Sequence, residues 1–426
     1  MRHFGLLSPQ SRAPARVLAQ RDYRFARPAP RTSPQSFAFP PYQVRGYSRC
    51  VTPLEELSLL LKPAGGGLYL VSTGAAEQLA LQKNLYGTDT AAGIQDGFLA
   101  ALERIRTARA IVLGAPSDVG AGFRRGANLG PQVMRTTLQA EDPTWNQKAR
   151  EAGIVDIGDV FVVPQLLHDD MLGEAQRAAS QRALYPTASE SVRATLPVSP
   201  LSIAERTMDL IFALNPDVIP FVLGGDHSNA WPVTASLGKQ GRPFGIVQPD
   251  AHTDLLAERL GVRYCFATWS YHANDVVGRG GRLVQVGTRA SRRDREHWES
   301  TLDVRQFWAA ECNADEAGTL DRLMAHLDAR RIDRVYFSND IDGTDARWAD
   351  ATGTPEPAGL TPDFVVALIR RLGTRIIAGD IMEVAPPLES RPGGSHDTLA
   401  LAARYIRETL AAALAAPDLR APSDRA

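Results

Sequence analysis

Apolar residues are gathered along this chain into short continuous runs, which alternate with longer segments of mixed polarity. A continuous apolar run marks a strand that is buried on both faces, whereas the longer segments have the pattern of helices. Strands that alternate with helices form a mostly parallel sheet, so the pattern predicts a three-layer α/β/α sandwich. We expect strands at 108–116, 217–225, 244–250, 282–289, 334–340 and 374–383, and helices at 199–214, 315–331, 361–373 and 396–416.

The N-terminal part does not share this rhythm. Residues 1–50 contain nine Arg, seven Pro and a single acidic residue, a composition that is typical of disorder. We interpret this segment as a tail; an organellar targeting peptide and a wrongly assigned start of translation are the alternatives. Residues 51–107 are predicted to form an N-terminal extension, with helices at 51–62 and 74–87 and a strand at 67–72, and residues 108–420 the main domain.

Composition and charge argue against several classes of protein. The formal net charge is −1 over 426 residues, which gives no reason to expect a nucleic acid or an anionic membrane as partner. No apolar run reaches the ~20 residues that a membrane-spanning helix needs. Cys50, Cys265 and Cys312 lack CxxC spacing, which argues against a disulfide framework and favours a reducing compartment. We therefore expect a cytoplasmic protein.

A polar cluster follows the predicted strand at 244–250. Its sequence, QPDAHTDLL, places Asp250, His252 and Asp254 at alternate positions. In extended backbone these three side chains share one face, beside the buried end of a strand. Carboxylates crowded at such a position are costly unless a cation neutralises them. The stretch therefore predicts a metal site.

Two other predicted strands deliver similar residues at their ends. The strand at 217–225 leads to His227, and the strand at 334–340 leads to Asp340 and Asp342. Ligands in parallel α/β folds bind outside the carboxyl ends of the strands, so all six side chains are expected to converge. Six ligands exceed the four of a zinc site, but they suit two ions with bridging carboxylates. The oxygen-rich set favours Mn²⁺, with Ni²⁺, Co²⁺ or Zn²⁺ as alternatives.

Each motif also has a structural explanation when it is considered alone. Asp226 or Ser228 could cap a helix in GGDHS, and SNDIDGTD resembles a fragment of a calcium loop. Considered together, these explanations would leave six ionisable groups at the edge of the core without a counter-charge. The joint pattern therefore favours a binuclear metal centre.

The three motifs, in this order and at these separations, resemble the ureohydrolase family, which comprises arginase, agmatinase and their relatives. The resemblance extends from GAPSDVGAGFRRGANLGP (114–131) to GDIMEVAPPLE (379–389) and into the last helix, and GTPEPAGLT (353–361) matches a family loop. It implies an open α/β/α fold with a ureohydrolase catalytic domain at 108–420. It also implies assembly as a homotrimer or homohexamer.

The resemblance implies that two divalent ions share the six ligands, with Asp250 and Asp340 bridging. Glu383 would bind the guanidinium group of the substrate by charge-assisted hydrogen bonds. Asp254 would pass a proton to the leaving amine, so that the products are urea and an amine or ammonia. One ion would be held by His227, Asp250, Asp254 and Asp340, and the other by Asp250, His252, Asp340 and Asp342.

The chain departs from the family pattern in GVRYCFATWSYHAND (261–275). Family members carry a His shortly after the DAHTD-like motif, where Cys265 stands here; His272 is the alternative if the loop is longer. Trp269 and Trp348 are expected on loops that rim the site, either as a cation–π wall or as ordinary packing. We predict that Cys265, Trp269, His272 and Trp348 line the substrate pocket.

The predicted function is that of an agmatinase-like amidinohydrolase that releases urea from a small guanidino compound. The apolar segment LLAERLGV (255–262) disfavours arginine itself, because arginases read the carboxylate of their substrate with polar residues there. A guanidine hydrolase and a guanidino-acid hydrolase of the same family are the alternatives. A catalytically silent, metal-binding regulatory subunit is the hypothesis from a different class, and the missing His prompts it.

Overall fold

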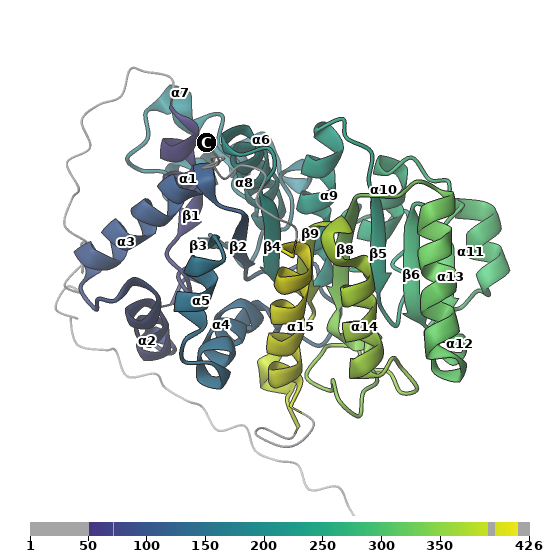
Figure 1. Ribbon diagram of the computed structural model, residues 1–426. Coiled ribbons are helices and arrows are strands. Elements are labelled where there is room, and N and C mark those ends of the chain that lie inside the picture. Colours follow the sequence, from purple (N-terminus) through teal and green to yellow (C-terminus); the bar gives the residue numbers. More distant parts are fainter. Residues whose placement is uncertain (1–50, 71, 391–396, 416–426) are drawn as a thin grey trace, which may run out of the picture. The chain divides into compact units, whose positions relative to one another are not determined.

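The computed structural model describes residues 51–70, 72–390 and 397–415, all of which belong to one compact unit (Figure 1). The expectations for residues 1–50 lie outside the described residues. A nine-stranded sheet has the strand order β1-β3-β2-β4-β9-β8-β5-β6-β7. Neighbouring strands are parallel except β1, which runs antiparallel to β3. The strands are β1 (Leu61–Lys62), β2 (Ala110–Ala115), β3 (Ile154–Val160), β4 (Ile219–Gly224), β5 (Gly245–Pro249), β6 (Leu283–Thr288), β7 (Arg305–Trp308), β8 (Val335–Asp340) and β9 (Ile376–Met382).

The sheet separates two hydrophobic cores. Successive side chains of a strand point to opposite faces, so Ile111 and Leu113 of β2 pack in one core while Val112 packs in the other. In β8, Tyr336 and Phe337 divide in the same way. Because both faces are covered, both sets of positions must be apolar, which explains the continuous apolar runs in the sequence.

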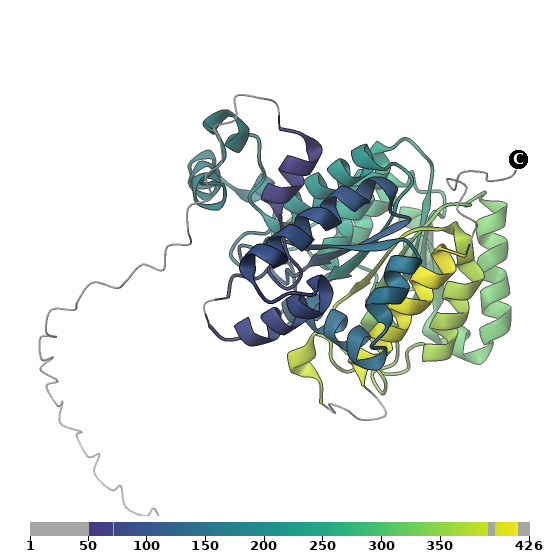
Figure 2. The ribbon, with the colours of Figure 1, turned by 60° about the vertical axis from the view of Figure 1, so that its left-hand side comes forward.

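Helices cover both faces of the sheet, as the turned view shows (Figure 2). This arrangement confirms the predicted α/β/α sandwich. No helix within the described residues combines the length and apolar character that crossing a membrane requires. One face is covered by α1 (Pro53–Leu60), α3 (Ala91–Arg104), α8 (Pro200–Leu214), α9 (Ala230–Lys239) and α10 (Trp269–Val276), the other by α4 (Gly130–Glu141), α5 (Trp145–Glu151), α12 (Ala309–Ala314), α13 (Glu316–Ala329), α14 (Pro362–Leu372) and α15 (Thr398–Ala413). The other α-helices are α2 (Ala75–Tyr86), α6 (Glu174–Leu184), α7 (Glu190–Arg193) and α11 (Arg295–Leu302).

The N-terminal extension is built into this unit. Leu57 and Leu60 of α1 are buried in the same core as β2 and β4. The strand predicted at 67–72 is wrong, because the described part of that stretch forms only a single bridge, from Leu68 to Val162. The strand of the extension is instead β1, which directly follows α1 and extends the sheet beyond β3.

The sequence pattern does not predict the strands β3 and β7. In β3, IVDIGDV, Asp156 and Asp159 interrupt the apolar run. Arg135 of α4 compensates both carboxylates: its Nε donates to Asp156 Oδ2 at 2.7 Å, and its Nη1 donates to Asp159 Oδ1. Arg135 and Asp159 are both buried. A long-range ion pair therefore allows an acidic segment to form an inner strand.

Candidate metal centre

The ends of three strands of the sheet position the predicted ligands. His227 follows β4 and opens a short 3-10 turn, His227–Asn229, which Asp226 caps by accepting a hydrogen bond from Ser228 N. Asp340 ends β8 and caps the next 3-10 turn, Ile341–Gly343, by accepting from Asp342 N at 2.9 Å. The motif after β5 has no helix of its own. The cap expected for GGDHS is therefore present, and it holds His227 in place.

His227 forms the centre of one ligand group. Its Nδ1 lies 3.0 Å from Asp340 Oδ2, 3.2 Å from Asp250 Oδ2 and 3.4 Å from Asp254 Oδ2. All four side chains are buried. Four potential metal ligands, which come from the ends of three strands, therefore lie close together.

His252 forms the centre of a second group. Its Nδ1 lies 3.1 Å from Asp342 Oδ2 and 3.6 Å from Asp250 Oδ1. Asp250 thus turns one oxygen toward His227 and the other toward His252. A carboxylate in this position can bridge two cations. Two ligand groups share Asp250: His227, Asp250 and Asp254 form one, and Asp250, His252 and Asp342 form the other. Asp340 lies beside His227 of the first group, and its role as a second bridging ligand stays a prediction.

The hydrogen bonds of His227 fit a metal ligand. Its Nε2 bonds to Ser338 Oγ at 3.1 Å, and Ser338 in turn donates to Asp380 at 2.9 Å. Its Nδ1 is buried and has no hydrogen-bond partner among the described residues. A metal-ligating His commonly has one ring nitrogen fixed by such an outer partner and the other free for the metal. The donor set therefore fits divalent ions.

The electrostatics of the cluster also call for a cation. Burial, together with the nearby charge of Asp250, raises the pKa of Asp254 well above its usual range. Burial and the charges of Asp342 and Asp250 do the same to the pKa of Asp340. Burial alone would raise the pKa of Asp250, but the adjacent imidazoles of His227 and His252 lower it. Without a cation, this cluster would hold protons on several of its carboxyl groups.

Glu383 lies beside this cluster. It follows β9, and its Oε1 accepts a hydrogen bond from His227 N at 3.0 Å. Burial and the charges of Asp340 and Asp226 raise the pKa of its carboxyl group well above the usual range. Asp254 and Glu383 both have left-handed backbone, with φ of 52° and 62°. Such strain in non-glycine residues concentrates at functional sites.

Comparison with known proteins identifies the family. The sequence model of the arginase family matches residues 108–412. The chain belongs to this family. A guanidinobutyrase of Pseudomonas aeruginosa is 30% identical over 312 residues, which cover 71% of this chain and 85% of that relative. A mitochondrial guanidino acid hydrolase of Homo sapiens is 29% identical, covering 71% and 78%. The solved agmatine ureohydrolase of Thermoplasma volcanium matches with a TM-score of 0.54 at 25% identity, covering 72% and 91%.

These relationships confirm three predictions made from the sequence. They are the membership of the ureohydrolase family, the arginase-like fold, and the enzyme class, a hydrolase that acts on the carbon–nitrogen bonds of guanidino compounds. The family match begins at Ala108, which is also the first residue of a strand predicted from the sequence. The N-terminal extension thus lies outside the part of the chain that the family model matches.

Trp269 does not line an open pocket in this member of the arginase family. It is fully buried, its Nε1 donates to Asp254 Oδ2 at 3.1 Å, and its ring lies 4.6 Å from that of His227. The expectation of a cation–π wall at this position is therefore wrong, because solvent cannot reach the indole. Trp269 thus contacts two members of the ligand cluster, Asp254 by a hydrogen bond and His227 by ring packing.

We expect Trp269→Phe to lower metal affinity or turnover by ~10–100-fold, the usual effect of losing a partner of a metal ligand. Phe retains the ring beside His227 but cannot donate to Asp254. Trp231→Phe is the matched control, because Trp231 Nε1 is buried without a hydrogen-bond partner among the described residues. Calorimetric metal titration and urea release would measure both variants. Equal losses in the two would show that the Asp254 hydrogen bond is unimportant.

The loop between β5 and α10 leads to the two candidates for the missing family His. His272 directs its Nε2 to the carbonyl oxygens of Ala257 and Arg263, at 3.0 and 3.1 Å. Its ring also packs against Tyr264, with 5.2 Å between ring centroids. His272 therefore ties two parts of this loop together, and this bonding argues against the prediction that it replaces the family His.

Cys265 is buried in the same loop. Its backbone N–H donates to Thr268 Oγ1 at 2.9 Å, and the Thr268 hydroxyl lies 3.7 Å from its sulfur. Burial raises the pKa of the thiol above its usual value. Cys265 is therefore a neutral thiol, which is unsuited to proton transfer near neutral pH.

We expect Cys265→Ala to keep turnover within about tenfold, because general acid catalysis is typically worth ~10²–10⁴ and a neutral thiol would not supply it. Asp254→Asn should cost far more, since it changes a member of the ligand cluster. Urea release by the two variants, each with its metal content verified, provides the comparison. If Cys265→Ala abolishes turnover while two ions stay bound, the thiol takes part in the chemistry.

Trp348 lies away from the ligand cluster. Its ring lies under the guanidinium of Arg347 at 4.8 Å, and it lines a cavity of about 710 Å³ together with Pro362 of α14 and Leu401 and Arg404 of α15. The structure thus does not place Trp348 at the pocket that was predicted for it. Sequence reasoning also missed the outer partners of the ligands, such as Ser338 and Asp380, because nothing in their local sequence indicates contact with His227.

Proposed function

We propose that this chain hydrolyses a small guanidino compound to urea and an amine at a centre of two divalent ions. The observation that carries the proposal is the pair of ligand groups that share Asp250, in a chain of the arginase family. When bound, the two ions supply Lewis-acid chemistry and make water more acidic. Side chains around the centre would bind the substrate and transfer the proton.

Glu383 and Asp254 are the proposed catalytic residues. A carboxylate binds a planar guanidinium through charge-assisted hydrogen bonds, and Glu383 is a buried carboxylate beside the cluster. Its Oε1 is occupied by His227 N, whereas its Oε2 lies on the side of Gly353. Asp254 is held by Trp269 at the edge of the first ligand group. From there it can accept a proton and pass it to the leaving amine.

The identity of the metal is proposed from the types of ligand. Four carboxylates and two imidazoles favour Mn²⁺, and Ni²⁺ is the principal alternative. We further propose a cytoplasmic homotrimer or homohexamer, as the resemblance to ureohydrolases and the scattered cysteines suggest.

A cavity of about 500 Å³ at the same ends of the strands bears on the substrate. Its lining residues include Cys265, Phe266 and Gly120, whose N–H donates to Asp226. Arg259 places its guanidinium 4.8 Å from the centre of the Phe266 ring. The positive charge of Arg259 would attract a substrate that carries a carboxylate at the end opposite its guanidino group. A guanidino acid is therefore the second candidate substrate, beside agmatine. The fully buried Trp269 removes the main argument for guanidine itself.

A urea-release screen tests the proposal. Agmatine, 4-guanidinobutyrate, arginine and guanidine would be assayed with the full chain loaded with Mn²⁺ or Ni²⁺. We expect urea from agmatine or 4-guanidinobutyrate and little from arginine. Arg259→Gln should weaken turnover of the guanidino acid more than that of agmatine. If no compound yields urea although two ions are bound, the chain is a silent metal-binding subunit.

A further inference from the structure

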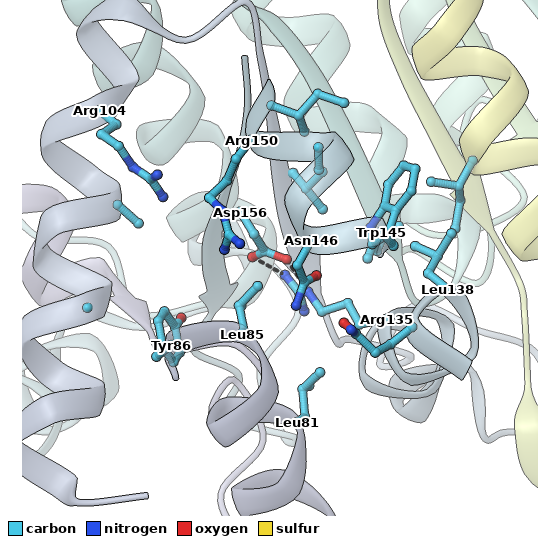
Figure 3. Close-up of a pocket in the computed structure, with 18 of the residues that line it drawn as sticks. Leu81, Leu85, Tyr86, Arg104, Arg135, Leu138, Trp145, Asn146, Arg150 and Asp156 are labelled. Carbon is cyan, nitrogen blue, oxygen red and sulfur yellow. Dashed lines mark hydrogen bonds and ion pairs between the residues drawn. The ribbon is translucent and has the colours of Figure 1, made fainter. Parts of the chain in front are cut away.

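A second cavity lies between the N-terminal extension and the sheet, apart from the metal centre. It has a volume of about 320 Å³, within the range of small-molecule sites. Its walls come from α2 and α3 of the extension and from α4 and α5 (Figure 3). Val112 of β2 and Leu223 of β4 form part of its floor. Because α2 and α3 precede residue 108, part of this cavity lies outside the family match.

The lining combines apolar walls with unpaired positive charge. Leu81, Leu85 and Trp145 provide apolar and aromatic surface. Arg104 of α3 and Arg150 of α5 also line the cavity, and Figure 3 shows both reaching toward the space between their helices. Both are exposed, and neither forms an ion pair with any residue that the structure describes.

The other charges at the cavity are already matched. Asp156 accepts from Arg135 Nε at 2.7 Å and from Arg135 Nη2 at 2.9 Å, and Gly158 N adds a third hydrogen bond. Arg135 is also bound to Asp159. The charge that remains for a ligand is therefore that of Arg104 and Arg150. Two guanidinium groups beside an apolar wall match a carboxylate joined to an apolar body.

We propose that this cavity binds a small organic anion, a carboxylate with an aromatic or aliphatic body. Arg104 and Arg150 hold the carboxylate, and the body packs against Trp145 and the two leucines. The adjacent amide groups of Gln139 and Asn146 provide further polar contacts. A ligand in this place touches both the extension and the central strands. The proposal does not depend on the reaction at the metal centre.

Calorimetric titration of the metal-loaded full chain with 4-phenylbutyrate tests the proposal. We expect one molecule to bind per chain, and the double variant Arg104→Gln/Arg150→Gln to bind it at least tenfold more weakly. Arg106→Gln is the matched control, because Arg106 is exposed two residues away but pairs with Glu103 and does not line the cavity. Its affinity should equal that of the wild type.

Two further arms separate the cavity from other places where a carboxylate could bind. Ala149→Leu, which fills the cavity without changing its charge, should also weaken binding at least tenfold. 4-Phenylbutylamine, of similar size but opposite charge, should bind at least tenfold more weakly than the acid. The absence of binding to the wild type would overturn the proposal. Wild-type affinity in both the double variant and Ala149→Leu would also overturn it, because the acid would then lie elsewhere, for example at the metal centre.

Discussion

Replacing Asp250 with Asn is expected to prevent the binding of both ions and to lower turnover by ~10³-fold or more, since metal ions supply several kcal/mol of transition-state stabilisation. Asp250 is the member that the two ligand groups share, with one oxygen toward His227 and the other toward His252. An amide offers a single neutral oxygen, so it cannot bridge two cations. Elemental analysis of the purified protein and urea release would measure the two effects.

Two variants sharpen this test. His252→Asn should reduce the metal content by one ion, because His252 belongs to one group only. Asp345→Asn is the matched control: Asp345 is buried in the loop after β8, but its carboxylate bonds to Arg347 and to Gly359 N rather than to the cluster. It should retain both ions. If Asp250→Asn also retains two ions, the shared-ligand assignment is wrong.

Replacing Arg135 with Met should destabilise the fold by about 3–5 kcal/mol, the usual cost of removing one partner from a buried ion pair. Asp159, with only 2% of its side chain exposed, and Asp156 would then be left without their counter-charge. Each would have to take up a proton or draw water into the core. Chemical denaturation monitored by circular dichroism would measure the loss of stability.

Arg206→Met is the control for this second prediction. Arg206 also pairs with a carboxylate, that of Glu56, at 2.6 Å, but 46% of its side chain is exposed. Solvent screens such a pair, so its loss should cost no more than about 1 kcal/mol. If the two variants are equally stable, the buried ion pair of β3 contributes no more than a surface one.

The ligand cluster could be predicted from the sequence because the carboxyl ends of parallel strands meet at one edge of the sheet. This rule brings together residues as distant as His227 and Asp342. The expectation that alternate residues continue the extended strand is wrong, because β5 ends at Pro249, Asp254 has a φ of 52° and Asp342 lies in a 3-10 turn. The central strands could also be predicted, since burial on both faces leaves a continuous apolar run.

The remaining features depend on contacts that local patterns do not reveal. The strand β3 escapes prediction because Asp156 and Asp159 break its apolar run, and their counter-charge comes from Arg135 in a different element. The sequence also does not reveal where Trp269 and His272 point, because both residues follow a long loop whose path decides their direction. His272 bonds to the backbone of that loop, and Trp269 points inward to Asp254.

The short strand β1 has a consequence for where this protein can be cut. The N–H groups of Gly65 and Gly67 donate to Asp159, and β1 pairs with the outer side of β3. A fragment that began where the family match begins would expose β3 as a bare edge, which is a template for aggregation. The start of the family match and the start of the cooperatively folded unit are therefore expected to lie at different residues, with β1 and α1 belonging to the folded unit.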